Sequence, residues 1–295
     1  MKSQGLRGRT DGRIAILAIA ALAAIHCDVN AALERVSEAR HRAADLLVQF
    51  TKAADASNRA VMADTDDASV AFAREAEQAK QAVQVDAEAL APILQSLGYS
   101  AETQRLEEFG RRFAEYRALD QTILELAVEN TNLKAQRLSF GPGQEAADAF
   151  RDALEAVAPL DAKDNWQVKT LGAAAVAAVR EIQALQAPHI ADADHDVMTR
   201  MEKRMVASEA AARSALETLA PLVQPAARPR LATANAALDR FMSVNAQVIA
   251  LSRRNTNVRS LALSLNQKGK LTGACEESLR GLREALAKRG FTGTR

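Results

Sequence analysis

Aromatic side chains, net charge and glycine are all scarce in this chain of 295 residues, and each shortage excludes a class of function. Phe, Trp and Tyr make up 4% of the residues, which leaves few platforms on which bases or sugars could stack. The 38 Lys and Arg residues nearly balance the 37 Asp and Glu residues, so we expect no nucleic-acid partner. The 13 glycines form no phosphate-binding loop.

Catalytic constellations are missing as well. No nucleophile, base and orienting group occur together at a suitable spacing, so we expect neither enzymatic activity nor a cofactor. Cys27 and Cys275 are too few for a disulfide framework and have no metal-type spacing. The stretch "HIADADHD" (189–196) is dense enough in His and Asp for a surface metal ion. Acidic turns also arise from helix capping, however, and we predict no metal site.

Residues that favour helices dominate the chain, and no long run of β-branched residues competes with them. We therefore predict an all-α fold in which turn residues separate long helices, with Trp166 anchored in the core at the start of one of them. The breaks include "FGPGQ" (140–144) and "LNQKGK" (265–270). The predicted helices cover about 30–63, 68–97, 100–139, a short stretch from 145, 165–187, 193–219, 229–265 and 270–289.

Three pairs of similar stretches indicate an internal repeat. "VENTNLKAQRLS" (128–139) resembles "RRNTNVRSLALS" (253–264), an offset of 125 residues from Asn130 to Asn255, and the same offset pairs Asp120 with Asn245. "EALAPIL" matches "ETLAPLV", and "MADTDD" matches "IADADH", in the same order along the chain. We predict two tandem related helical units, 28–158 and 159–295.

The apolar spacing around the repeated triplet predicts long antiparallel bundles. Apolar residues recur at steps of four and three, a heptad seam that favours helices crossing at about 20°. Asn130 and Asn255 occupy seam positions, where a buried amide without partners costs about 1–3 kcal/mol. Two interpretations stay open, a device that fixes helix register and a polar cavity for a ligand. A sensing role predicts that Leu at either position raises stability and weakens any ligand response, whereas an intact response would mean that the amides only fix the register.

The N-terminus has the pattern of a targeting segment. "KSQGLRGRTDGR" (2–13) is basic, and "IAILAIAALAAI" (14–25) is wholly apolar but shorter than the roughly 20 residues of a spanning helix. This pattern is typical of the basic and apolar regions of an export signal. We predict that residues 1–27 are a signal peptide or a short membrane anchor. The bundle would then be periplasmic, or anchored to the inner membrane outside the cytoplasm.

One family resemblance accompanies these patterns. "LDQTILELAVENTNLKAQRLSFGPGQEAADAF" (119–150), preceded by "ASVAFAREAEQA" (68–79), resembles the extracytoplasmic sensory region of bacterial methyl-accepting chemotaxis proteins of the four-helix-bundle type. The resemblance implies a homodimeric bundle that binds a small organic acid or amino acid between helices and passes a small helix displacement across the membrane. The chain has no second membrane helix and no cytoplasmic signalling hairpin of that family, so sensing is expected and signal transduction by this chain alone is not.

Arginine and asparagine are the expected contacts of an anionic ligand, because a guanidinium matches a carboxylate with two parallel hydrogen bonds. The alternative is a solvated helix face with local ion pairs. Two other classes also stay open: an exported helical scaffold or interaction protein without a small-molecule ligand, and a lipid-surface binder. The candidate ligand-binding residues are Asn130, Arg137, Arg253, Arg254, Asn255 and Arg259.

Overall fold

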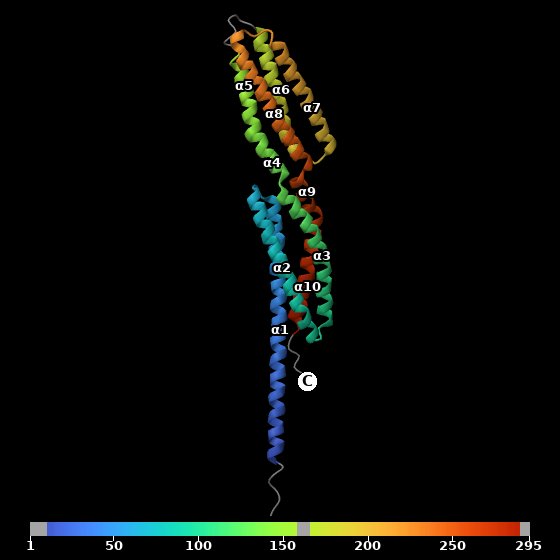
Figure 1. Ribbon diagram of the computed structural model, residues 1–295. Coiled ribbons are helices and arrows are strands. Elements are labelled where there is room, and N and C mark those ends of the chain that lie inside the picture. Colours follow the sequence, from blue (N-terminus) through green and yellow to red (C-terminus); the bar gives the residue numbers. More distant parts are fainter. Residues whose placement is uncertain (1–10, 158–165, 290–295) are drawn as a thin grey trace, which may run out of the picture. The chain divides into compact units, whose positions relative to one another are not determined.

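The computed structural model describes residues 11–157 and 166–289, with the side chains of the first helix described from Ala31 onward. Every regular element in these residues is helical and none is a strand, which confirms the predicted all-α fold (Figure 1). The helices gather into two compact units. Unit 1 takes the described residues of Met1–Asn58, Phe72–Asp120 and Gln267–Arg295, and unit 2 takes Arg59–Ala71 and Gln121–Asn266.

Unit 1 is a four-helix bundle of α1 (Asp11–Met62), α2 (Asp66–Ser96), α3 (Ser100–Glu129) and α10 (Gly269–Lys288). The turn between α2 and α3 is short and uses Gly98 at φ 68°, so these two helices run antiparallel. Aromatic rings contact one another edge to face or stacked at its centre. Its core consists of Ala39, Ala43, Leu46, Phe50, Val83, Leu90, Leu94, Leu106, Phe109, Phe113, Tyr116, Cys275, Leu279, Leu282 and Leu286.

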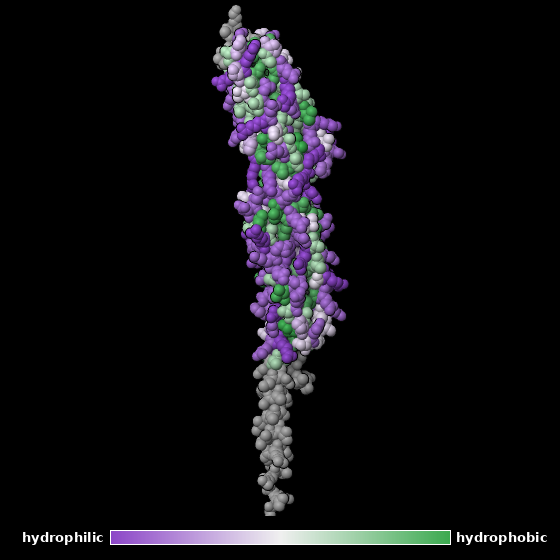
Figure 2. Space-filling model, in the orientation of Figure 1, coloured by the Kyte–Doolittle hydropathy of each residue, from purple (hydrophilic) through white to green (hydrophobic). Residues whose placement is uncertain are grey.

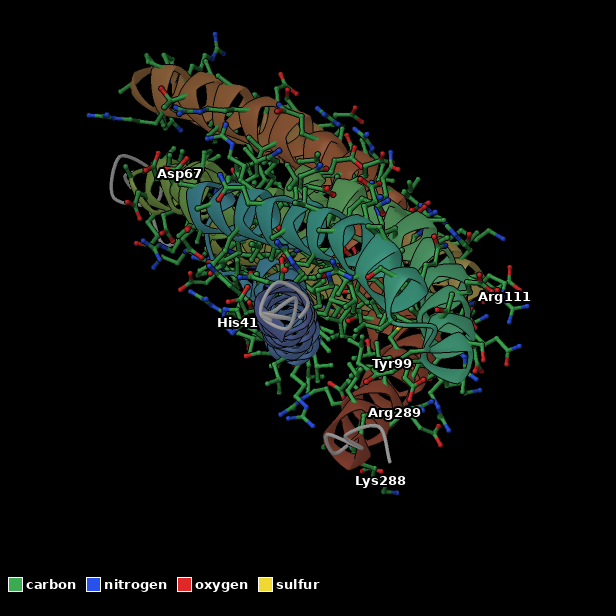
Figure 3. All side chains as sticks on the ribbon, turned by 90° about the horizontal axis from the view of Figure 1, so that it is seen from below. His41, Asp67, Tyr99, Arg111, Lys288 and Arg289 are labelled. Carbon is green, nitrogen blue, oxygen red and sulfur yellow. The ribbon has the colours of Figure 1, made fainter. Side chains whose placement is uncertain are left out.

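The end of α10 is fixed to the start of α3 by an arginine. Arg289 donates from Nε and Nη2 to the two carboxylate oxygens of Glu102, at 2.8 and 3.0 Å. Its guanidinium also lies 4.5 Å from the centre of the Tyr99 ring. Tyr99 and Arg289 are both labelled in Figure 3. The hydrogen bonds from Arg289 lower the pKa of Glu102, so this contact holds an ionised carboxylate.

Unit 2 is built from helices around a second apolar core. In chain order they are α4 (Thr131–Leu138), the π-helix η1 (Ser139–Gly143), α5 (Gln144–Glu155), α6 (Trp166–Ala191), α7 (His195–Leu219), the 3-10 turn η3 (Pro225–Ala227), α8 (Arg228–Arg254), α9 (Thr256–Leu263) and the start of the π-helix η4 (Ser264–Lys268), whose residues from Gln267 onward belong to unit 1. Helices α5, α6, α7 and α8 enclose a core that includes Phe150, Ile182, Met205, Leu216 and Phe241. Trp166 does not belong to it; its side chain is 68% exposed, so the prediction of a core anchor was wrong.

Both long central helices end earlier than predicted, and for the same reason. The predicted helices 100–139 and 229–265 are each interrupted at an asparagine in the left-handed conformation, Asn130 and Asn255. The stretch "FGPGQ" was predicted to end the helix. Instead, a π-helical turn contains Pro142, which has no N–H to donate, and the helical backbone continues into α5. The second predicted break, at "LNQKGK", is likewise a π-helix leading into α10.

The compact units group the chain by contact, whereas the predicted division into 28–158 and 159–295 concerns the sequence repeat and stays a prediction. The chain leaves unit 1 after Asp120 and returns at Gln267, so most of unit 2 is inserted between parts of unit 1. The predicted boundary at Pro159 and the side chains of residues 1–27 lie outside the described residues. Within the described part of the chain, no helix combines the length and apolar character needed to cross a membrane. Hydrophilic side chains predominate on the visible face of both units (Figure 2).

Candidate functional site

The repeated Asn-Thr-Asn triplets meet in unit 2, and we name residues 130–132 and 255–257 together the NTN junction. Asn130 (φ 54°) and Asn255 (φ 53°) are the non-glycine residues with positive φ in the described chain. Each asparagine ends one helix as a left-handed C-cap and also begins the next helix. Its carbonyl oxygen accepts from the N–H four residues later, that of Lys134 or Arg259, at 3.0 Å. This conformation costs an L-residue roughly 1–2 kcal/mol, so the surrounding contacts must hold it in place.

Helices α4 and α9 cap each other through the junction. Thr131 N donates to Thr256 Oγ1 at 3.1 Å, and Thr256 N donates to Thr131 Oγ1 at the same distance. Asn132 N donates to Asn257 Oδ1, and Asn257 N donates to Asn132 Oδ1, each at 3.1 Å. The first N–H groups of a helix have no partner within their own helix, and here the other copy of the triplet supplies it. The arrangement therefore has two-fold symmetry in its hydrogen bonds.

The side-chain amides of the junction break this symmetry. The two crossing bonds are equivalent, from Asn132 Nδ2 to Asn255 Oδ1 and from Asn257 Nδ2 to Asn130 Oδ1, both at 2.8 Å. Asn255 Nδ2 also donates to the Asp192 carbonyl at 2.7 Å. Asn130 Nδ2, by contrast, is buried and has no partner among the described residues. One half of the junction is thus closed by the α6–α7 turn, and the other half has an unsatisfied donor.

The predicted arginines do not converge on these asparagines. Arg137 pairs with Asp66 at 2.9 Å on an exposed face, and Arg254 pairs with Glu129. Arg259 is exposed. Of the six candidate residues, the structure brings Asn130 and Asn255 into one hydrogen-bonded cluster and places the arginines in ion pairs or facing solvent.

The fourth arginine, Arg253, belongs to a half-buried ion-pair network beside the junction. It donates to Glu202 from Nε at 2.6 Å and from Nη2 at 2.9 Å, which lowers the pKa of Glu202 against the opposing effect of burial. His189 is fully buried and places Nε2 2.8 Å from the same carboxylate and Nδ1 2.6 Å from Ser252 Oγ. Because the Ser252 hydroxyl donates to the His189 carbonyl, this pattern is satisfied when both ring nitrogens donate.

The segment 189–196 carries capping groups rather than a metal centre. Asp194 caps α7 by accepting from Asp196 N at 2.7 Å and Val197 N at 3.2 Å, and Asp192 accepts from Asp194 N at 2.8 Å. Among residues 11–157 and 166–289, no group of three or more His, Cys, Asp or Glu side chains is placed to hold a metal ion. The capping interpretation of these acids is confirmed.

Sequence reasoning missed a second polar cluster, in unit 1, which we name the charged layer: Ser57, Lys80, Tyr116, Asp120 and Lys268. All five side chains are at most 2% exposed. Lys80 Nζ lies 2.7 Å from Asp120 Oδ2 and also 2.7 Å from Glu77, whose side chain reaches solvent. Ser57 Oγ donates to Asp120 Oδ1, and Lys268 Nζ donates to Ser57 Oγ at 2.6 Å. Four helical segments therefore place polar side chains in one buried layer, and three of them contribute a charge.

The charged layer is incompletely paired. The nearest carboxylate oxygen to Lys268 Nζ is Asp120 Oδ1 at 3.5 Å, and burial lowers the pKa of this lysine while Asp120 opposes that shift. The Tyr116 hydroxyl is buried beside Asp120, and no acceptor meets it at close hydrogen-bond geometry in the described chain. Burial, and next the Asp120 carboxylate, raise the pKa of Tyr116 far above its ordinary value, and a hydrogen bond toward Asp120 adds to this shift. Its O–H is thus a neutral donor held beside the Asp120 carboxylate.

Unit 2 contains a neutral counterpart of this layer. Asn245 stands at the repeat offset from Asp120 and accepts from Gln186 Nε2 at 2.8 Å, while Ser139 Oγ donates to Gln186 Oε1 at 2.7 Å. Gly143 stands at the same offset from Lys268. The same kind of buried polar layer is thus built from amides and a hydroxyl in one unit and mainly from charged groups in the other. Uncharged groups suffice to build it, so the charges of unit 1 need another explanation.

The chain has no significant match among protein-family models, curated proteins or solved structures. Its function must therefore be argued from the NTN junction and the charged layer themselves.

Proposed function

We propose that this chain is an extracytoplasmic sensory bundle of the chemoreceptor type, which binds a small molecule and responds by shifting between two nearby helix packings. The observation that carries the proposal is the NTN junction, where both long helices are broken at equivalent points and cap each other. Export, attachment to the membrane through residues 1–27 when they are uncleaved, and a homodimeric assembly belong to the same proposal.

The junction has the energetics of a two-state element. Two left-handed asparagines cost roughly 1–2 kcal/mol each, and the unsatisfied Asn130 amide costs about 1–3 kcal/mol. The reciprocal bonds offset these terms, and the proposal takes a second packing of the junction to lie within a few kcal/mol of this one. A ligand that prefers one packing by that amount moves the population from one state to the other.

The asymmetry of the junction supports one place for such a shift. On one side, carbonyls at the end of α6 and in the α6–α7 turn satisfy the amides, because Ile190 O accepts from Asn132 at 2.6 Å and Asp192 O accepts from Asn255. On the other side, the Asn130 amide nitrogen has no acceptor among the described residues. A displacement that gives Asn130 a carbonyl partner would close the second half as the first is closed.

The experiment combines a ligand screen with amide exchange on the full-length chain. A library of small organic acids and amino acids is screened by thermal shift, since a ligand of the folded state raises the melting temperature by mass action. Hydrogen exchange is then measured with and without each hit at the four junction amides, Thr131, Asn132, Thr256 and Asn257. We expect exchange there to change at least about tenfold, while amides in the middle of α7 serve as the internal control.

Three outcomes would contradict the proposal. Thermal stabilisation without any change at the junction amides would mean a binding protein whose response does not use this element. The absence of any stabilising compound would favour the competing function, an exported helical scaffold without a small-molecule ligand. A gain of stability on lipid vesicles alone would favour a lipid-surface binder.

A further inference from the structure

We propose that the buried His189 is a proton-binding site that couples pH to the NTN junction: a proton on Nδ1 of its ring stabilises the closed half of the junction, and loss of that proton weakens it. The proposal adds the proton as an effector of the junction. It rests on the proposed function in one respect, that the junction is a movable element, and it requires no small-molecule ligand.

The contacts of the His189 ring decide which of its two nitrogens can release a proton. Nε2 lies 2.8 Å from Glu202 Oε1. The hydrogen bonds from Arg253 lower the pKa of Glu202, so this carboxylate is ionised near neutral pH and can only accept, which keeps a proton on Nε2. Nδ1 lies 2.6 Å from the Ser252 hydroxyl, a group that can donate as well as accept. Nδ1 is therefore the nitrogen that can gain or lose a proton while the ring keeps both contacts.

The Ser252 hydroxyl reverses when Nδ1 changes its protonation state. With a proton on Nδ1, the ring donates to Ser252 Oγ, and the hydroxyl donates to the His189 carbonyl at 2.8 Å. Without that proton, Nδ1 becomes an acceptor, and the single hydroxyl hydrogen turns from the carbonyl to the ring. The carbonyl belongs to the last turn of α6, where C=O groups lack partners in their own helix and where the helix dipole favours a cation. The proton thus adds one hydrogen bond and a favourable charge at this helix end.

The end of α6 carries this change to the junction. The carbonyl of Ile190, the next residue along the chain, accepts from Asn132 Nδ2 at 2.6 Å, and that of Asp192 accepts from Asn255 Nδ2 at 2.7 Å. Side chains of α8, of α4 and of the junction thus hold three carbonyls within four residues. Releasing the first of them allows the neighbouring peptide group to turn, so the two bonds that close this half of the junction should weaken.

Other charged groups surround this end of α6, and one of them is a second histidine. Histidine is the side chain whose charge ordinarily changes between about pH 5 and pH 8. His195 is exposed and its Nδ1 lies 3.2 Å from Arg253 Nη1, so its protonation acts on that guanidinium and not on the α6 carbonyls. The charged groups on the elements around the ring are Glu202 and His195 of α7, Arg253 of α8, Asp192 of the α6–α7 turn and, on α4, Lys134, which donates to the Glu129 carbonyl, and Arg137, which pairs with Asp66.

Apolar residues stand at the matching positions of the first copy of the repeat. Val61 precedes "MADTDD" as His189 precedes "IADADH", and Ala127 stands at the triplet offset from Ser252. Both are buried, as their counterparts are. The histidine network lies beside the closed half of the junction, whereas the Asn130 amide of the other half is unsatisfied. The network therefore occurs together with closure, and the helices pack in the other copy without it.

The test measures amide exchange of the full-length chain at about pH 5.5 and about pH 8. Each rate is divided by the intrinsic rate at that pH, and the protection of Thr131, Asn132, Thr256 and Asn257 is compared with that of amides in the middle of α3. We expect the relative protection of the junction amides to fall at least about fivefold at the higher pH, the effect of weakening one hydrogen bond. Nitrogen NMR shifts of the His189 ring should show Nδ1 losing its proton over this range while Nε2 keeps its own.

Two variants and a matched control separate the parts of the device. Ser252→Ala removes the hydroxyl, and Ala127 already occupies the matching position of the first copy. This variant should show the low protection of the high-pH state at both pH values while its His189 ring still titrates. His189→Gln keeps a donor toward Glu202 and should also remove the pH dependence. The control is His195→Gln, which replaces the exposed histidine of the same network and should retain the wild-type pH dependence.

The proposal is overturned if the protection of the wild-type junction follows that of α3 at both pH values, or if the Nδ1 proton stays in place up to about pH 8. It is also overturned if Ser252→Ala keeps the wild-type pH dependence or if His195→Gln loses it. If His189→Gln does not fold, Ser252→Ala and the ring spectrum decide. A junction that ignores pH leaves the small-molecule screen unaffected, so failure of this proposal is distinguishable from failure of the proposed function.

Discussion

Replacing the junction threonines by valine tests whether the reciprocal caps hold the two broken helices together. Valine keeps the shape of threonine and removes only the hydroxyl. In Thr131→Val, the buried Thr256 N–H loses its acceptor at 3.1 Å, and the hydroxyl pair at 3.2 Å is lost as well. Thr256→Val is the mirror-image change, because Thr131 N then loses Thr256 Oγ1.

The expected magnitudes follow from these contacts. Each single change leaves one buried N–H unsatisfied, so each should lower the free energy of unfolding by about 1–3 kcal/mol. The double variant loses both N–H acceptors but loses the hydroxyl pair only once. It should therefore cost less than the sum of the single changes, by about 0.5–1.5 kcal/mol, which is the worth of that one hydrogen bond.

The assay is equilibrium urea unfolding of the full-length chain, with the four members of the cycle measured together. Thr218→Val is the control, because this threonine is exposed and its hydroxyl bonds only to Ser214 O in its own helix; a change within about 0.5 kcal/mol is expected. The reasoning is refuted if both single variants behave like the control, or if the two changes are strictly additive.

Three further predictions concern other buried groups. Asn130→Leu was expected from the heptad seam to raise stability, but at φ 54° it should lower it by about 2 kcal/mol in urea unfolding, whereas Asn130→Gly should change it by less than about 1 kcal/mol. The hydrogen bonds from Arg253 lower the folded-state pKa of Glu202, so their stabilisation is complete above the ordinary value of 4.5 and is lost as the pH falls through the folded pKa. Glu202→Gln should accordingly flatten the acid decline of stability between about pH 5 and pH 3, and an unchanged decline would contradict the assignment. Burial raises the pKa of Cys275 to about 12, so in a Cys27→Ser background a thiol reagent at about pH 8 should label Cys275 only after unfolding; rapid labelling of the folded chain would show that the thiol is accessible.

The sequence was sufficient for the helical fold and for recognising the two triplets, and the reason is their contrast with their surroundings. A polar triplet in an apolar heptad pattern is conspicuous, and both asparagines are indeed buried. Their left-handed conformation was not predictable, because the heptad pattern continues unbroken through Asn130 into Leu133. The heptad pattern of apolar residues indicates which helix face is buried, but it contains no information on a local change of backbone direction.

The charged layer was missed because its members look like ordinary surface residues. Lys80 and Lys268 lie in polar stretches where a solvated helix face is the usual interpretation, and they meet Asp120 only through long-range packing. One signal was present: the repeat pairs Asp120 with Asn245, a charged residue with a neutral one. A charge that appears in one copy of a repeat and not in the other is a reason to examine what surrounds it.

The exchange of caps between two distant stretches also constrains the order in which the chain can fold. Thr131 N and Asn132 N find their acceptors on Thr256 and Asn257, which a ribosome adds much later. Until then the N–H groups of Thr131 and Asn132 can bond only to water, so the start of α4 is not buried among apolar side chains. The reciprocal caps can therefore form only after the second copy of the triplet has been synthesised.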